Sequence, residues 1–187
     1  KVQERALYES ASQYQKSGNL IRAALALEQL VKQHPQSELA DESLYRAAGL
    51  REGLENWSLA AADYIRVSEN YPSSKHAVKS LKNAAICYEN GEDWTSAKVL
   101  YERFASTHPS ETEDVIECKF KSGEMSFKMK IFVEAKATFL EVISLYRKFT
   151  DTGNFVDNYY VANAQFMLGE IEFDEYTKLE LKPPLNV

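Results

Sequence analysis

The sequence predicts an all-α fold, a solenoid of stacked antiparallel helix hairpins with about nine helices in a single domain over residues 1–187. Three observations support this prediction. A proline recurs at a fixed interval, and apolar residues between the prolines follow helical spacing. Only seven residues are Gly and five are Pro, about half the usual share, which argues against a turn-rich all-β fold. The chain is 44% hydrophobic and can therefore bury a core.

A repeat of 37 residues organises the chain. An equivalent proline, preceded by His or Tyr, occurs at Pro35, Pro72 and Pro109. An equivalent alanine occurs at Ala23, Ala60 and Ala97, and after 38 residues at Ala135. Large apolar residues lie three residues before, four after and seven after each alanine. This spacing puts them on one face of an α-helix.

Each repeat contains an earlier helix as well, marked by a small residue twelve positions before the alanine: Ala11, Ala48, Ala85 and Gly123. We expect helices over residues 3–17, 20–34, 37–54, 57–71, 74–90, 94–107, 111–129, 132–149 and 156–180. They form units 3–35, 37–72, 74–109 and 111–149, followed by a terminal helix. One hairpin cannot bury both of its faces, so the units must stack.

The ends of these helices follow from the polar residues between them. Asn or Asp in the break inside a hairpin is a natural cap for the second helix, as at Asn19, Asn56 and Asp93. The proline ends that helix. A serine after the proline offers a cap for the next hairpin, at Ser37, Ser74 and Ser110.

This pattern resembles the tetratricopeptide repeat (TPR) family over essentially the whole chain. The resemblance rests on the alternation of small and large residues, which in the third unit are Ala85, Trp94, Ala97, Tyr101, Phe104 and Pro109, and on the pair Leu168-Gly169. It implies a right-handed superhelix that binds a protein or peptide partner. The 37-residue period and the segment Tyr71-Pro72-Ser73-Ser74 are similar to bacterial envelope members, namely the lipoprotein of outer-membrane barrel assembly and the Tol-system coordinator.

The resemblance also implies that the first helix of each hairpin lines a concave groove. Register with the small residue gives the groove positions Arg5, Tyr8, Ser12, Gln15, Glu42, Tyr45, Gly49, Glu52, Lys79, Lys82, Ile86, Glu89, Glu117, Phe120, Glu124 and Phe127. Spacings of three and four keep each set on one helix face. Tyr8, Tyr45 and Phe120 form an aromatic row that would anchor a peptide, or these rings pack between adjacent first helices. The Lys and Asn clamp for acidic chaperone tails is absent, so such tails are not the predicted ligand.

Composition and motifs exclude several function classes. The net charge is −6, which does not favour nucleic-acid binding. The longest segment without a charged residue is twelve residues, too short to span a membrane. His34 and His108 share a repeat position with Tyr71 and are assigned to packing, and His76 is expected to be solvated. Two free thiols are expected at Cys87 and Cys118, and we predict neither metal, cofactor nor enzymatic activity.

The fourth unit and the last helix depart from the repeat. The fourth unit has Lys119 where the others have Leu, and Gly123 to Gly169 is 46 residues. We favour a tolerated loop insertion at residues 150–154 over a change of superhelix pitch that shapes a cleft. The last helix, which Lys182-Pro183-Pro184 ends, has no partner helix and an excess of acids. It caps the fourth hairpin, or a further repeat follows it, or a second copy docks there.

The leading hypothesis is therefore a noncatalytic scaffold that holds a peptide segment of another protein in the groove. The alternatives are self-association through the last helix, giving a homo-oligomer, or the regulatory part of a larger envelope or signalling protein. The chain begins at Lys1, and we expect it to be an excised fragment of a longer protein. Its location stays open between the bacterial periplasm or envelope and the cytoplasm.

Overall fold

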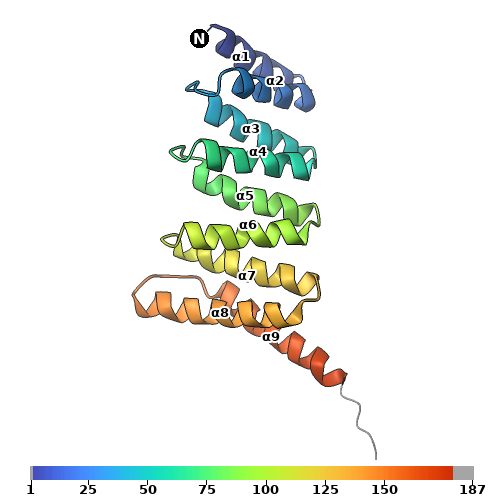
Figure 1. The fold of residues 1–187 in the computed structure, drawn as a ribbon, viewed down its shortest axis with the longest axis vertical. Helices are drawn as coiled ribbons and strands as arrows, with labels where there is room; N and C mark the ends of the chain where they lie inside the picture. The colour runs from blue at the N-terminus through green and yellow to red at the C-terminus, as the bar shows by residue number, and fades with distance from the viewer. Residues whose placement is uncertain (1, 179–187) are drawn as a thin grey trace, which may run out of the picture. The chain divides into compact units, whose positions relative to one another are not determined.

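The computed structural model describes residues 2–178, and every regular element in that range is an α-helix (Figure 1). The helices are α1 (Val2–Lys16), α2 (Leu20–Gln33), α3 (Ala40–Gly53), α4 (Trp57–Asn70), α5 (Ala77–Asn90), α6 (Trp94–Thr107), α7 (Thr112–Lys128), α8 (Phe132–Asp151) and α9 (Tyr159–Thr177). They confirm the predicted all-α solenoid of helix hairpins. Residues 179–180 of the predicted last helix, and its predicted stop at residues 182–184, lie outside the described residues.

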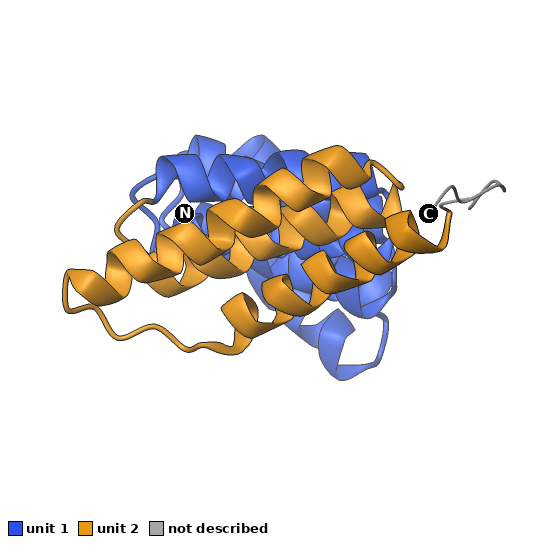
Figure 2. Ribbon diagram, turned by 90° about the horizontal axis from the view of Figure 1, so that it is seen from below, with its two compact units in different colours: residues 1–108 blue, residues 109–187 orange. Residues whose placement is uncertain are grey.

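The helices belong to two compact units, residues 1–108 and 109–187, which Figure 2 shows in different colours. In the first unit, α1 pairs with α2, α3 with α4 and α5 with α6, and neighbouring hairpins meet where α2 contacts α3 and α4 contacts α5. In the second unit, α7 pairs with α8, and α9 packs against α8 and, less extensively, against α7. Helix α9 therefore contacts the second helix of the preceding hairpin, as the first helices α3 and α5 do.

The break inside each hairpin has the same backbone geometry. One residue at an equivalent repeat position has a positive φ: Gly18 (77°), Glu55 (58°), Glu92 (59°) and Lys130 (61°). A left-handed residue turns the chain directly after a helix. Asn19 and Asp93 then cap the second helices as predicted, accepting hydrogen bonds from the backbone N–H groups of Arg22 (3.2 Å) and Ser96 (3.1 Å). The side chain of Asn56 makes no capping bond.

The prediction that Ser37 and Ser74 cap the following helices is wrong. Helices α3 and α5 each begin three residues later than predicted. The hydroxyl groups instead donate to an acid on the first helix of the preceding hairpin, from Ser37 to Glu4 Oε2 (2.8 Å) and from Ser74 to Asp41 Oδ2 (2.7 Å). Each hydroxyl also accepts the backbone N–H two residues later. These serines therefore join successive hairpins rather than starting a helix.

One large side chain from each second helix fills the centre of its hairpin, and the equivalent residues are Leu27, Tyr64, Tyr101 and Phe139, none more than 3% exposed. A buried hydroxyl group needs a hydrogen-bond partner. The two tyrosines donate to Glu52 Oε2 (2.8 Å) and Glu89 Oε2 (2.6 Å), respectively. In the fourth hairpin both members of this pair are apolar, because Phe127 occupies the position of the acid. An acid therefore accompanies the central ring where the ring carries a hydroxyl group, and an apolar residue accompanies it where the hydroxyl group is missing.

Gly123 lets α7 and α8 approach closely. A Cβ atom at this position would lie 2.6 Å from Cε1 and 2.9 Å from Cδ1 of Phe139. Phe139 is fully buried, and its ring centroid lies 5.7 Å from that of Phe120, so the ring would have to move within a buried core. The small residue predicted from the repeat is therefore a requirement of this helix pair.

The second unit has a core of its own, formed by α7, α8 and α9 around Ile116, Phe120, Phe139, Val142, Ala164 and Ile171. The segment between α8 and α9 contributes Val156, which is 5% exposed.

The prediction that Ser110 caps α7 is wrong, because Glu111 directly precedes this helix and no side chain caps it. None of the described helices is long and apolar enough to cross a membrane.

Candidate binding surface

The predicted groove residues of the first unit lie on α1, α3 and α5, and side-chain contacts connect these helices. The guanidinium group of Arg46 donates to Gln15 Oε1 (2.8 Å) and lies 4.9 Å from the ring centroid of Tyr8. The ring of Tyr45 stacks on that of His76, with centroids 4.2 Å apart. Arg46 thus joins α1 to α3, and His76 joins α3 to the start of α5. Neither residue was among the predicted groove positions.

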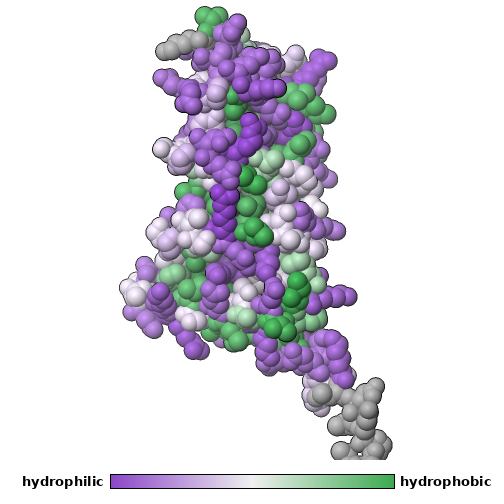
Figure 3. Space-filling model, viewed as in Figure 1, coloured by the Kyte–Doolittle hydropathy of each residue, from purple (hydrophilic) through white to green (hydrophobic). Residues whose placement is uncertain are grey.

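The groove positions of this unit differ in exposure. Four are exposed: Arg5, Gln15, Gly49 and Lys79. Eight are half-buried: Tyr8, Ser12, Glu42, Tyr45, Glu52, Lys82, Ile86 and Glu89. Hydrophobic and hydrophilic patches also alternate over the molecular face in Figure 3. The first-helix face of this unit therefore presents exposed cations and a glycine beside half-buried rings and acids.

His76 is not solvated as the sequence predicted. Its side chain is 17% exposed, and its Nε2 atom lies 2.7 Å from Glu42 Oε2. The ammonium group of Lys75 lies 3.9 Å from the same oxygen. The sequence could not indicate this contact, because Glu42 and His76 are 34 residues apart and meet only when successive hairpins stack. Two predicted groove residues, Glu42 and Tyr45, are thus held in place by one imidazole ring.

The acids at the C-terminal end of this face are also held by internal bonds. Glu52 and Glu89 each accept the hydrogen bond from the central tyrosine of their own hairpin. Burial, followed by the hydrogen bond to the Glu52 carboxylate, raises the pKa of Tyr64 well above its ordinary value. The tyrosine therefore stays a hydrogen-bond donor over the physiological pH range and fixes the orientation of the carboxylate.

In the second unit, the predicted groove residues Glu117, Phe120, Glu124 and Phe127 lie on α7. Phe120 is only 5% exposed, and its ring centroid lies 5.7 Å from those of Phe139 and Tyr160. Phe127 is half-buried with its ring centroid 5.4 Å from that of Phe132. Of the two interpretations of the aromatic row, packing therefore describes Phe120, which is covered and cannot anchor a ligand in this structure.

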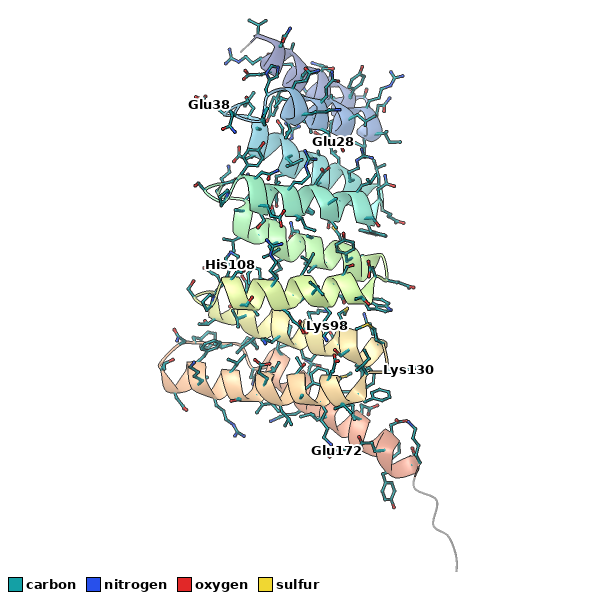
Figure 4. The ribbon with its side chains drawn as sticks, viewed as in Figure 1. Glu28, Glu38, Lys98, His108, Lys130 and Glu172 are labelled. Atoms are coloured by element: carbon teal, nitrogen blue, oxygen red, sulfur yellow. The ribbon has the colours of Figure 1, made fainter. Side chains whose placement is uncertain are left out.

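A buried carboxylate on α4, which was not among the predicted positions, lies near charged residues of α2 and α3. Asp63 is 6% exposed and accepts a hydrogen bond from Arg66 Nη1 at 2.7 Å. Nearby, Arg51 forms an ion pair of 2.7 Å with Glu28, which is labelled on α2 in Figure 4. Burial and the Glu28 carboxylate raise the pKa of Asp63 to about 6. The first and third hairpins have Ala26 and Leu100 at this position, which would have marked Asp63 as an exception.

The two cysteine thiols are buried, and neither forms a disulfide bond. Burial, and to a lesser extent the Glu52 carboxylate, raises the pKa of the Cys87 thiol to about 12, so the reactive thiolate is scarce at neutral pH. Among the described residues, no group of three or more His, Cys, Asp or Glu side chains is placed to hold a metal ion.

Comparisons with known proteins agree with this architecture. A tetratricopeptide repeat family model matches residues 5–37 and 83–110. No curated protein sequence matches the chain. Solved structures show similar folds at low sequence identity. MamA (residues 41 to the end) from Desulfovibrio magneticus RS-1 is 17% identical with a TM-score of 0.51, covering 78% of this chain and 76% of that one.

Two further structures cover 93% of this chain. A tetratricopeptide repeat protein from Parabacteroides merdae ATCC 43184 is 14% identical with a TM-score of 0.62 over 62% of its own length. A structure of TPR-like repeats from Podosopora anserina, which are nearly identical to one another, shares 15% sequence identity with this chain. Its TM-score is 0.58 over 87% of its own length. The family model thus matches two segments of the chain, and these neighbours show the same type of fold at low sequence identity.

Proposed function

We propose that the chain is a noncatalytic scaffold that binds a peptide segment of another protein on the first-helix face of residues 1–108. Tetratricopeptide repeats are in general protein-interaction modules, and the family match covers parts of the first and third hairpins. The proposed contacts are the exposed Arg5 and Lys79, the open position Gly49, and the half-buried rings Tyr8 and Tyr45. The narrower resemblance to bacterial envelope proteins stays a prediction.

The observation that carries this proposal is the internal bonding of the face. Tyr45 stacks on His76, Arg46 lies against Tyr8, and Tyr64 orients Glu52. Side chains that are ordered before a ligand arrives lose less conformational entropy on binding. Gly49 adds an open position between the rings and the acid, because a Cβ atom there would meet only the hydroxyl oxygen of Tyr64, at 3.7 Å. A peptide side chain fits such an opening.

The test is a peptide selection followed by measured affinities. Peptides are selected from a displayed random library on the immobilised chain, and their Kd is measured by fluorescence anisotropy. The double variant Arg5→Glu/Lys79→Glu changes the two exposed cations of the face. The control Arg22→Glu/Lys32→Glu has the same net charge but changes two exposed cations on α2, a second helix.

We expect the first variant to weaken binding by about tenfold or more, since contacts to a few central residues dominate such interfaces. We expect the control to bind as the wild-type chain does. Equal Kd values for both variants and the wild-type chain, with unchanged circular dichroism, would contradict the location of the binding face.

A further inference from the structure

Helix α9 repeats a motif of α7 but exposes it. The segment 120–127 is Phe-Lys-Ser-Gly-Glu-Met-Ser-Phe and the segment 166–173 is Phe-Met-Leu-Gly-Glu-Ile-Glu-Phe. Both have the form Phe-x-x-Gly-Glu-x-x-Phe. In α7 this motif faces the second helix of its hairpin, where Phe120 and Phe127 contact rings of α8 and Gly123 admits Phe139. In α9 the equivalent Phe166 is 63% and Phe173 66% exposed.

The buried residues of α9 follow the pattern of a first helix on the side that packs against the preceding hairpin. Val161, Ala164 and Ile171 are buried, and they are equivalent to the buried Ala77, Ser80 and Cys87 of α5. These positions pack on the preceding hairpin. The positions that face the second helix of the same hairpin are buried in α5, as Leu81 and Ala85, but exposed in α9, as Gln165 and Gly169. Among the described residues, α9 thus has the packing of a first helix without a second helix.

The exposed side of α9 is apolar where a covering helix would lie. Tyr159 and Tyr176 are 60% and 71% exposed and extend the row of Phe166 and Phe173 at spacings of seven and three. A Cβ atom at Gly169 would meet nothing within 4 Å, so the space that Phe139 fills beside Gly123 is open here. We name Tyr159, Phe166, Gly169, Phe173 and Tyr176 the α9 aromatic face. Contiguous exposed apolar surfaces of this kind mark interaction sites.

Charge limits what can cover this face. Glu170, Glu172, Asp174 and Glu175 lie in the C-terminal half of α9, and Asp174 forms an ion pair with Lys178. Glu172 and Glu175 share Lys136 of α8, at 3.3 and 3.8 Å (Figure 4 labels Glu172). A second copy of this chain, whose net charge is −6, would bring further negative charge. A helix with Lys or Arg on its flanks complements the acids.

We propose that the α9 aromatic face binds an amphipathic, basic helix of another protein that has the apolar pattern of α8. This pattern is a large residue, then a small residue three positions later, then a ring four positions after that, as in Phe132, Ala135 and Phe139. The ring enters the space above Gly169 between Phe166 and Phe173, and the basic flank contacts the acids of α9. This site is separate from the first-helix face of residues 1–108 and does not depend on a function there.

The probe is a fluorescein-labelled peptide with the sequence of residues 132–151 in which Glu134 and Glu141 are replaced by Lys. A second peptide carries Phe139→Ala in addition. Each is titrated with the full chain, and Kd is measured by fluorescence anisotropy. The test variant of the chain is Phe166→Gln/Phe173→Gln. The matched control is Leu140→Gln, an apolar residue of α8 that is 53% exposed and lies outside the α9 aromatic face.

We expect the test variant and the Phe139→Ala peptide each to weaken binding by about tenfold or more. We expect Leu140→Gln to leave Kd unchanged. Gly169→Leu, which fills the open space with a good helix former, should weaken binding without lowering the melting temperature. Equal Kd values for the two peptides, or for the wild-type chain and the Phe166→Gln/Phe173→Gln variant, would overturn the proposal.

Light scattering tests whether a second copy of this chain covers the α9 aromatic face instead. We expect a mass of 21.3 kDa that does not change over a hundredfold dilution. A doubled mass that the Phe166→Gln/Phe173→Gln variant abolishes would show that a second copy covers the face, and would overturn the partner helix. No binding of the basic peptide up to the solubility limit of the chain would overturn it as well, because the proposed pattern is then not sufficient for recognition.

Discussion

Replacing Gly123 by alanine should destabilise the second unit, although alanine is the better helix former. The new Cβ atom would lie 2.6, 2.9 and 3.2 Å from three carbons of the Phe139 ring, where ordinary carbon contacts are about 3.5–4.0 Å. Relief requires the fully buried ring to move by about 1 Å against Phe120. Overpacking of this kind costs about 1–3 kcal/mol.

The gain in helix propensity offsets about 1 kcal/mol of that cost. We therefore expect Gly123→Ala to lower the free energy of unfolding by up to about 2 kcal/mol, measured by urea denaturation followed by circular dichroism. The matched control is Gly169→Ala, at the equivalent position of α9, where nothing lies within 4 Å of the new atom. It should raise the free energy of unfolding by about 0.5–1 kcal/mol.

The comparison of the two glycines is the decisive part of this experiment, since both lie in the same motif of the second unit. If Gly123→Ala were as stable as Gly169→Ala, the close approach of α7 and α8 at Phe139 would not be a constraint. The assignment of Gly123 as the position that a ring fills would then be wrong.

Three further predictions concern the first unit. Asp63 has a folded pKa of about 6 against an ordinary 3.8, so its stabilising contribution is present below about pH 4 and lost as the pH rises through 6. The free energy of unfolding is measured in urea at pH 4 and at pH 7. Between these two pH values, the difference between Asp63→Asn and wild type should shift in favour of the variant by up to about 3 kcal/mol, and an unchanged difference would contradict the raised pKa. Glu92→Gly, at a φ of 59°, should raise the free energy of unfolding by about 0.5–1 kcal/mol, and a loss of stability would count against left-handed strain there. Tyr101→Phe removes the donor to Glu89 and should cost about 1–2 kcal/mol, whereas wild-type stability would show that the bond contributes nothing.

The positions of the helices could be predicted from the sequence because they depend on local patterns. The apolar spacing, the small residues and the caps at Asn19 and Asp93 all lie within one repeat. The starts of α3 and α5 were predicted wrongly because the hydroxyls of Ser37 and Ser74 bind acids on the first helix of the preceding hairpin. Serine is a favoured N-cap residue, and only the stacked arrangement shows that a carboxylate binds these hydroxyl groups instead.

The candidate surface was harder to predict for the same reason. The stack of His76 on Tyr45 joins residues of different hairpins, so neither local spacing nor helix periodicity indicates it. The repeat register placed Tyr45 and Phe120 at equivalent positions, and sequence reasoning left both groove and packing open for them. In the structure Tyr45 is half-buried and Phe120 is covered by α8 and α9. Equivalence in the repeat therefore does not imply equal exposure.

The same distinction applies to the two copies of the Phe-x-x-Gly-Glu-x-x-Phe motif. Both helices have the residues that accept a covering helix, but only α7 has one among the described residues. Burial is a property of the neighbours of a motif and not of the motif alone, so the sequence of α9 predicts what can bind to it rather than whether it is exposed. In α7, the rings and Gly123 belong to the hydrophobic core. In α9, the same residue types at the same spacing form an apolar surface whose complement is a helix with a ring like Phe139.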